Sequence, residues 1–202
     1  MTKDALKPLQ ILVVLSIVLL ALVGWFLYDD PKASTPKTNT LENLGGDFTL
    51  QSADGPVSLH DFKGKAVAIY IGYASCPDVC PTALAIMRQA FVNLPEAYQD
   101  RVHGIFISVD PERDTPEKLK TYTAFFSPKF TGLTGTKEEI DKVVDQYGAF
   151  YRMVKLENSN MGYAVDHSSR IYFISPDGQL MTTLSHTAPP KAVEDVLIKA
   201  LQ

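Results

Sequence analysis

The two cysteines of the chain, Cys76 and Cys80, are separated by only three residues in the stretch SCPDVCP. A thiolate is both a nucleophile and a soft metal ligand. A close pair can therefore form a disulfide, exchange electrons with another dithiol, or hold a metal such as copper or zinc. Pro81 favours a helix that opens near Cys80. The amino end of a helix lowers the pKa of a thiol, and this serves the redox and the metal chemistry equally.

The segments on either side of the cysteines predict an α/β domain. The apolar, β-branched run KAVAIYIGYA before them indicates a buried central strand, and PTALAIMRQAFVNL after them has the periodicity of a helix. A dithiol between such a strand and helix is the thioredoxin-like arrangement, although its redox version carries C-x-x-C. We therefore predict a thioredoxin-like mixed sheet flanked by helices, with an N-terminal β-hairpin.

Turn and capping residues place most of the other elements. Asp-Gly pairs at residues 54–55 and 177–178 predict two hairpins. Thr115 followed by Pro116 predicts the start of one helix, and the capping-box spacing of Thr136 and Glu139 predicts another over residues 136–148. Strands are expected at HGIFISVD and AFYRMVKL, and a last helix is expected over residues 190–201.

A third ligand would favour a metal site, because an imidazole suits copper and zinc. Among the four histidines, we expect His60, His103 and His186 to be surface residues. His167 lies in GYAVDHSSRIYF, in a loop before a predicted sheet strand, and in thioredoxin-like folds this loop faces the dithiol. His167 is the candidate ligand, with a capping or packing role as the alternative. Asp166 beside it could orient the imidazole.

The N-terminal region predicts a membrane anchor. Residues 11–28 (ILVVLSIVLLALVGWFLY) carry no charge; as a helix they would span about 27 Å, close to the ~30 Å hydrocarbon core of a bilayer. We predict a cytoplasmic N-terminus over 1–10, a transmembrane anchor over 11–28, a polar linker over 29–43 and the folded domain over 44–202. The expected location is the inner membrane, single-pass, with the domain on the oxidising periplasmic side.

The composition and net charge indicate which kinds of partner the chain can bind. The chain is 46% hydrophobic, as in a globular protein, and its formal net charge is −4. Phosphate backbones are bound by basic surfaces, so this charge argues against a nucleic-acid partner.

Three motifs, SCPDVCP, SVDPERDTPEKLKTY and VDHSSRIYFISPDG, occur in that order and resemble the Sco/SenC family of copper chaperones, which assemble cytochrome c oxidase. The resemblance covers nearly all of residues 45–200. It implies that Cys76, Cys80 and His167 bind Cu(I) and Cu(II). It also implies delivery of copper or electrons to the copper A site of cytochrome c oxidase subunit II, and it leaves room for an upstream periplasmic copper chaperone. We interpret the stretch DPERDTP first as a turn and helix cap.

Three other interpretations of the cysteines remain. Cys76 and Cys80 alone would suffice as the redox-active pair of a thiol–disulfide oxidoreductase that reduces the copper-ligand cysteines of oxidase subunit II. Dithiol reductases hold substrate with a cis-proline in the loop that faces the dithiol. In this chain the loop before residue 170 has no proline, which counts against the oxidoreductase. Zinc could replace copper as the metal. A purely structural disulfide would close a tiny loop and stabilise the fold little.

Overall fold

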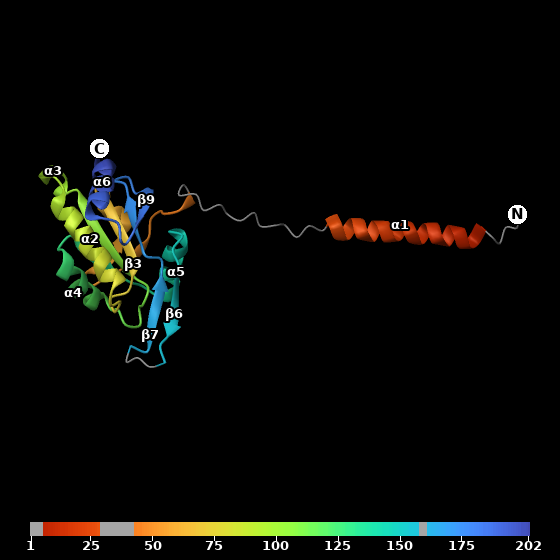
Figure 1. The fold of residues 1–202 in the computed structure, drawn as a ribbon, viewed down its shortest axis with the longest axis horizontal. Helices are drawn as coiled ribbons and strands as arrows, with labels where there is room; N and C mark the ends of the chain where they lie inside the picture. Colours follow the sequence, from red (N-terminus) through yellow and green to blue (C-terminus); the bar gives the residue numbers. More distant parts are fainter. Residues whose placement is uncertain (1–5, 29–42, 158–160) are drawn as a thin grey trace. The chain divides into compact units, whose positions relative to one another are not determined.

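The computed structural model describes residues 6–28, 43–157 and 161–202. The predicted linker, except for its last residue, and the N-terminal five residues therefore lie outside the described part. The chain divides into two units, Met1–Thr38 and Asn39–Gln202, which are described separately here. The first contains α1 (Leu6–Tyr28), and all other elements belong to the second (Figure 1).

The predicted membrane anchor falls within α1. A membrane crossing needs about 20 consecutive, predominantly apolar residues. The side chains of α1 are described only over residues 12–23. In the described part of the chain, no helix has both the length and the apolar character that a crossing requires. The prediction of a single-pass anchor, and with it that of an inner-membrane location with a periplasmic domain, is overturned.

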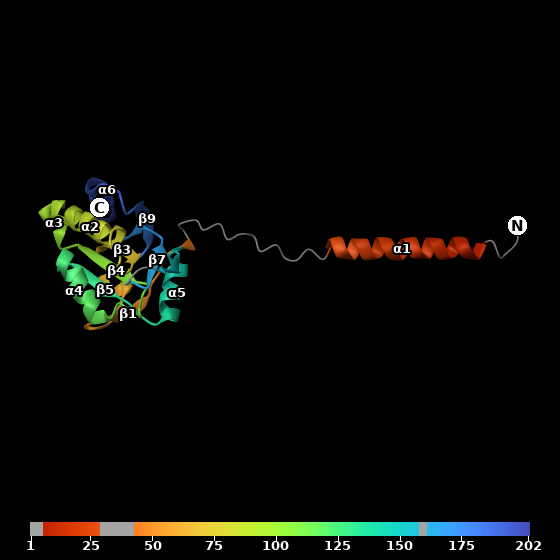
Figure 2. The ribbon, with the colours of Figure 1, turned by 60° about the horizontal axis from the view of Figure 1, so that its bottom comes forward.

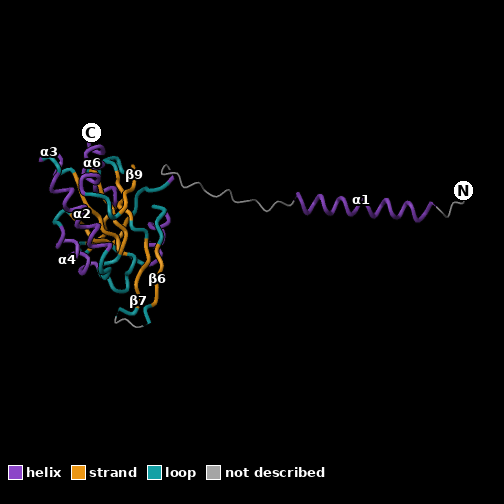
Figure 3. The backbone as a smooth tube through the Cα atoms, viewed as in Figure 1, coloured by secondary structure: helices purple, strands orange, loops and turns teal. Residues whose placement is uncertain are grey.

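The second unit is built on a five-stranded mixed sheet with the strand order β5-β4-β3-β8-β9. β4 runs parallel to β3 and β5, whereas β8 runs antiparallel to β3 and β9. Two further pairs, β1-β2 and β6-β7, form two-stranded antiparallel sheets of their own (Figure 3). The strands are β1 (Thr49–Ser52), β2 (Gly55–Ser58), β3 (Ala66–Gly72), β4 (Val102–Ser108), β5 (Phe130–Leu133), β6 (Tyr151–Lys155), β7 (Tyr163–His167), β8 (Arg170–Ile174) and β9 (Leu180–Ser185).

Helices cover both faces of this sheet. The helices are α2 (Val79–Asn93), α3 (Glu96–Gln99), α4 (Pro116–Phe126), α5 (Lys137–Gln146) and α6 (Pro190–Leu201), with a 3-10 turn at Leu59–Phe62. α2 packs against α4 and α6 on one face, and α5 lies on the opposite side of the sheet (Figures 1 and 2). The predicted α/β architecture, a mixed sheet flanked by helices with an N-terminal hairpin, is confirmed.

The structure confirms the predicted central strand and the predicted capping residues of two helices. All seven residues of β3 are buried, as expected of a central strand. The side chain of Thr115 accepts a hydrogen bond from the amide of Lys118 and caps α4. Thr136 and Glu139 form the reciprocal capping box of α5. These contacts fix the helix starts that follow β4 and β5.

Two strands were not predicted. β5 is only four residues long and contains Gly132, so it has little strand propensity of its own. It forms because β4 offers it a parallel edge. β7 forms because it pairs with β6 over five residues, from Tyr151 opposite His167 to Lys155 opposite Tyr163. His167 therefore ends a strand and does not lie in a free loop.

The packing of α2 on the sheet yields a stability prediction. Leu84 is fully buried, whereas Val92 on the same helix is 59% exposed. Leu84→Ala should lower the free energy of unfolding by about 2–5 kcal/mol through lost burial and the cavity left behind. Val92→Ala should change it by about 0.5 kcal/mol or less. Chemical denaturation of both variants checks this, and equal effects would contradict the assignment of Leu84 to the core.

Candidate metal and redox centre

The two cysteines lie where β3 leaves the sheet and α2 begins. The amide of Cys76 donates a hydrogen bond to the carbonyl oxygen of Tyr73 at 3.2 Å, and this bond closes the turn that follows β3. Cys80 is the second residue of α2, as predicted, and its thiol is completely buried, whereas Cys76 is 8% exposed. Between them, Pro77 and Asp78 are exposed. The start of the helix thus buries both cysteines, Cys80 completely and Cys76 almost completely.

His167 reaches this dithiol from the separate β6-β7 sheet. Its Nε2 lies 3.5 Å from Cys80 Sγ, and its Nδ1 lies 3.4 Å from the carbonyl oxygen of Ser168. The ligand atoms of Cys76, Cys80 and His167 all lie within 4.8 Å of one another. In the described part of the chain, no other group of histidine, cysteine and acidic side chains converges in this way. Small shifts of these side chains would let all three atoms bind one metal ion at bond lengths of about 2.0–2.3 Å.

Aromatic rings and a glycine shape the inner wall of the centre. The rings of Tyr70 and Tyr73 meet the His167 imidazole nearly edge-on, with centroid distances of 6.0 and 5.9 Å. A Cβ at Gly72 would lie 2.6 Å from Cys80 Sγ, so only glycine lets the sulfur approach the strand this closely. Sequence reasoning missed these three residues, although Tyr70 and Gly72 share one strand face by their two-residue spacing.

The two thiols differ strongly in their acidity. A hydrogen bond from Cys80, helped by His167 and by backbone amides at the start of α2, lowers the pKa of Cys76 to about 3 against the opposing effect of burial. The same hydrogen bond, together with burial, raises the pKa of Cys80 above its ordinary value. At neutral pH the pair therefore carries one negative charge, on Cys76, and one proton, on Cys80.

The other predicted residues have different places. His60 is exposed, as expected, and pairs with Asp47 at 2.7 Å. His186 is half-buried and lies 3.3 Å from the carbonyl of Ser169. His103 has the same intermediate exposure, so neither residue is as exposed as predicted; His103 stacks on the Phe62 ring, and burial lowers its pKa to about 4.

Asp166 does not orient the imidazole. Successive residues of a strand point to opposite faces, so Asp166 faces away from His167. Its carboxylate pairs with Arg152 across the β6-β7 hairpin at 2.7 Å. The group near His167 Nδ1 is the backbone carbonyl of Ser168 and not the Asp166 carboxylate.

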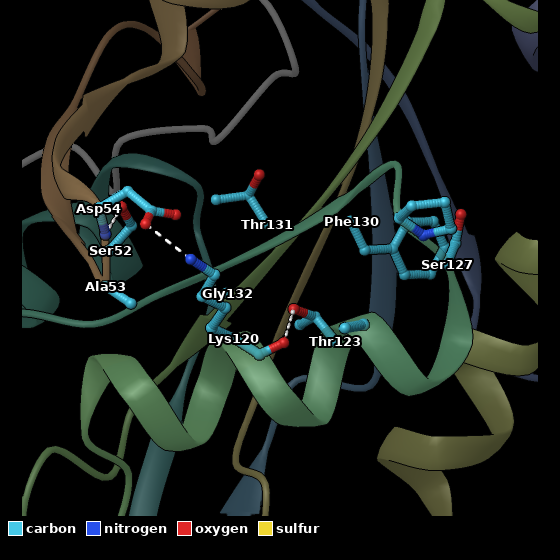
Figure 4. Close-up of a pocket in the computed structure, with 11 residues that line it drawn as sticks. Ser52, Ala53, Asp54, Lys120, Thr123, Ser127, Phe130, Thr131 and Gly132 are labelled. Carbon is cyan, nitrogen blue, oxygen red and sulfur yellow. Dashed lines mark hydrogen bonds and ion pairs between the residues drawn. The ribbon is translucent and has the colours of Figure 1, made fainter.

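A pocket of about 230 Å³ lies elsewhere, between the β1-β2 turn, α4 and β5. Two of its lining residues, Asp54 and Lys120, form an ion pair at 2.6 Å, and the hydroxyl of Thr123 donates to the backbone carbonyl of Lys120 in α4 (Figure 4). No cysteine or histidine lines this pocket. The chemistry predicted from the sequence therefore belongs to the cysteine–histidine cluster.

Comparison with known proteins bears on the same region. The profile of the SCO1/SenC family matches residues 36–202. A "SCO2-like protein" from Rickettsia felis is 37% identical over 155 residues, covering 76% of this chain and 75% of its own. The mouse "Protein SCO1 homolog, mitochondrial" is 41% identical over 140 residues, covering 68% and 49% of the two chains.

Solved structures agree with this. Copper-bound ScoI of Bradyrhizobium japonicum is 36% identical, with a TM-score of 0.69 over 78% of this chain and 99% of that one. BsSco, described as a member of the Sco family of cytochrome c oxidase assembly proteins with a disulfide switch, is 27% identical, with a TM-score of 0.62 over 80% and 95%.

The acidity of Cys76 can be tested by alkylation. A thiol of ordinary pKa, about 8.5, loses about 100-fold in thiolate between pH 7 and pH 5. Cys76 should react with iodoacetamide at nearly the same rate at both pH values, because its pKa is about 3. Peptide mapping by mass spectrometry measures the rate at this residue.

A matched pair of variants tests the cause. Cys80→Ser keeps a hydrogen-bond donor beside Cys76 and should keep the flat pH profile. Cys80→Ala removes the donor and should shift the alkylation profile of Cys76 to higher pH. Identical profiles for the two variants would contradict the role of the Cys80 hydrogen bond.

Proposed function

Because the chain belongs to the SCO1/SenC family, we propose that it is a copper chaperone. It binds Cu(I) and Cu(II) as cargo through Cys76, Cys80 and His167. Its target is the copper A site of cytochrome c oxidase subunit II, which it supplies or matures. The observation that carries the proposal is the convergence of two sulfurs and one imidazole nitrogen within 4.8 Å. Copper-bound relatives and the oxidase-assembly role of the family support it.

The donor set suits this cargo. Thiolates select soft metals such as Cu(I), and imidazole accommodates copper in either state. Metal ligands must be deprotonated, and Cys76 already is, because its pKa lies far below neutrality. Loading therefore displaces one thiol proton, from Cys80, whose pKa is raised. Copper binding should weaken as pH falls, since protons then compete for all three ligands.

Copper titration of the reduced protein tests the proposal. Wild type should bind one equivalent of Cu(I) and of Cu(II), the latter with a thiolate-to-copper absorption band. His167→Ala removes one of three ligands, and should weaken Cu(II) binding by more than the ~10–100-fold typical of outer-shell losses. The thiolate-to-copper absorption band should also shift in this variant.

The control is His60→Ala, which removes an exposed imidazole paired only with acidic side chains. This variant should bind copper as wild type does. Absence of copper binding by the reduced wild type would refute the proposal. Displacement of bound copper by equimolar zinc would assign the site to zinc instead.

The thiol pair itself favours a second candidate, a thiol–disulfide oxidoreductase acting on the copper-ligand cysteines of subunit II. The Cys76 thiolate would attack a substrate disulfide, forming a mixed disulfide and releasing one substrate thiolate. The Cys80 sulfur would then attack Cys76, releasing the second substrate sulfur, while its proton passes to a leaving thiolate. Two substrate sulfurs are reduced, and Cys76 and Cys80 are oxidised to a disulfide.

This candidate makes a separate prediction. Reduction of a copper-site disulfide needs both cysteines but no imidazole ligand. Its rate should survive His167→Ala within about threefold and vanish in Cys76→Ser, because the thiolate is the nucleophile. A chromogenic disulfide assay under regenerating conditions measures both variants. A reductase activity abolished by His167→Ala would count against this candidate.

A further inference from the structure

Two completely buried carboxylates, Asp110 and Asp114, lie in the connection between β4 and α4. This is the DPERDTP stretch, which the sequence suggested to be a turn and a cap. The cap itself needs only Thr115. Burying two charged groups is costly unless each is paired and hydrogen-bonded. Their partners show what the two carboxylates hold together.

Asp114 holds the loop that carries the cysteines. Its Oδ2 accepts hydrogen bonds from the amide of Ala74, at 2.7 Å, and from the hydroxyl of Ser108, at 2.6 Å. Its Oδ1 accepts from Lys118 Nζ at 2.7 Å. Lys118 in turn donates to Ser75 Oγ at 3.2 Å, next to Cys76. The two residues that precede Cys76 are thus tied to the start of α4.

Asp110 and Arg113 hold the strand that ends in His167. Asp110 Oδ1 accepts from the hydroxyl of Tyr163 at 2.6 Å, and Asp110 Oδ2 pairs with Arg113 Nε at 2.5 Å. Arg113 Nη1 donates to the backbone carbonyls of Met161 and Tyr163 at 3.1 and 3.0 Å. Its guanidinium carbon lies 3.7 Å from the centre of the Tyr163 ring. Tyr163 and His167 share one face of β7 by their four-residue spacing.

The two halves of the centre lie in different sheets, and only Ser168 and Ser169 separate β7 from β8 along the chain. The cysteines follow β3 of the five-stranded sheet, whereas His167 belongs to the two-stranded β6-β7 sheet. No strand ladder among the described residues joins these sheets. Residues 110–114 contact both, through Asp114 on one side and through Asp110 and Arg113 on the other. Arg113 is also 5.7 Å from the ring of Tyr73, which itself packs on His167.

We infer that Asp110, Arg113 and Asp114 are positioning residues that keep the imidazole and the two sulfurs within ligand distance of one another. They touch no ligand atom and act through Ala74, Ser75 and Tyr163. The inference rests on the proposed function for its metal readout, but the placement of the two segments can be measured without metal.

Two conservative variants separate the two sides. Arg113→Lys keeps the charge but loses the fork that reaches Asp110 and two carbonyls at once. It should weaken Cu(II) binding about 10–100-fold, the usual cost of losing an outer-shell partner. The nitrogen hyperfine coupling of His167 in the Cu(II) EPR spectrum should weaken or disappear. Two titratable thiols should remain.

Asp114→Asn places an amide NH₂ where one carboxylate oxygen accepted hydrogen bonds, so either Lys118 or the pair of Ala74 and Ser108 loses its acceptor. The amide hydrogen of Ala74 should exchange faster with solvent than in wild type. Cu(I) binding by the two cysteines should weaken together with Cu(II) binding. Hydrogen exchange followed by NMR, at Ala74 and across β7, gives the metal-free readout for both variants.

Arg88→Lys, at an exposed position on α2, is the matched control and should leave copper affinity, EPR coupling and exchange unchanged. Wild-type copper affinity, coupling and exchange in both test variants would overturn the inference, and so would equal changes in the control. If the wild type binds no copper, the proposed function fails. The exchange rates at Ala74 and β7 then decide the positioning role by themselves.

Discussion

The contact between Cys80 Sγ and His167 Nε2, at 3.5 Å, is the point on which the arrangement of the domain depends. The two residues are 87 positions apart in the chain, and they lie on different sheets. Bringing them together requires that β3 be central and buried and that α2 start immediately beyond it. It also requires that β7 lie against β3. A glycine at position 72 is part of the same requirement, because any side chain there would occupy the space of the sulfur.

The unequal acidity of the cysteines follows from this geometry. A pair of neighbouring thiols cannot both ionise easily in a buried place, because like charges repel and burial disfavours each charge. The more exposed sulfur, Cys76, takes the negative charge and is stabilised by the buried thiol and by amides at the start of α2. The pair is thereby prepared for ligand chemistry and for disulfide chemistry alike. The difference between the proposed functions lies in whether the imidazole takes part.

Much of this could be predicted from local sequence. The strand before Cys76, the helix after it and the capped starts of α4 and α5 depend on neighbouring residues, and each was found. β5 and β7 were missed because they are short and owe their strand conformation to partners distant in the chain. The same reason explains Asp166, whose place beside His167 suggested a contact that strand alternation prevents. The apolar run at residues 11–28 misled because its composition alone was read as a membrane span.

The site itself shows a similar division. Residue type and spacing pointed to Cys76, Cys80 and His167, and the family resemblance strengthened that choice. Their surroundings could not be read in the same way, because Tyr70, Tyr73 and the buried carboxylates of Asp110 and Asp114 look like ordinary core and turn residues in sequence. Their relation to the centre becomes visible only when distances and burial are known.

The difference in exposure among the three candidate ligand residues also determines from which side the centre can be reached. Cys80 is completely buried and Cys76 is 8% exposed, whereas His167 is partly exposed. An incoming ligand from another protein would therefore meet a soft ion held here from the side of His167 and Cys76. Exchange would then be associative and stepwise, with the imidazole and the Cys76 sulfur displaced before the Cys80 sulfur. Such an order keeps the ion coordinated throughout, so that it is handed over without ever being free in water.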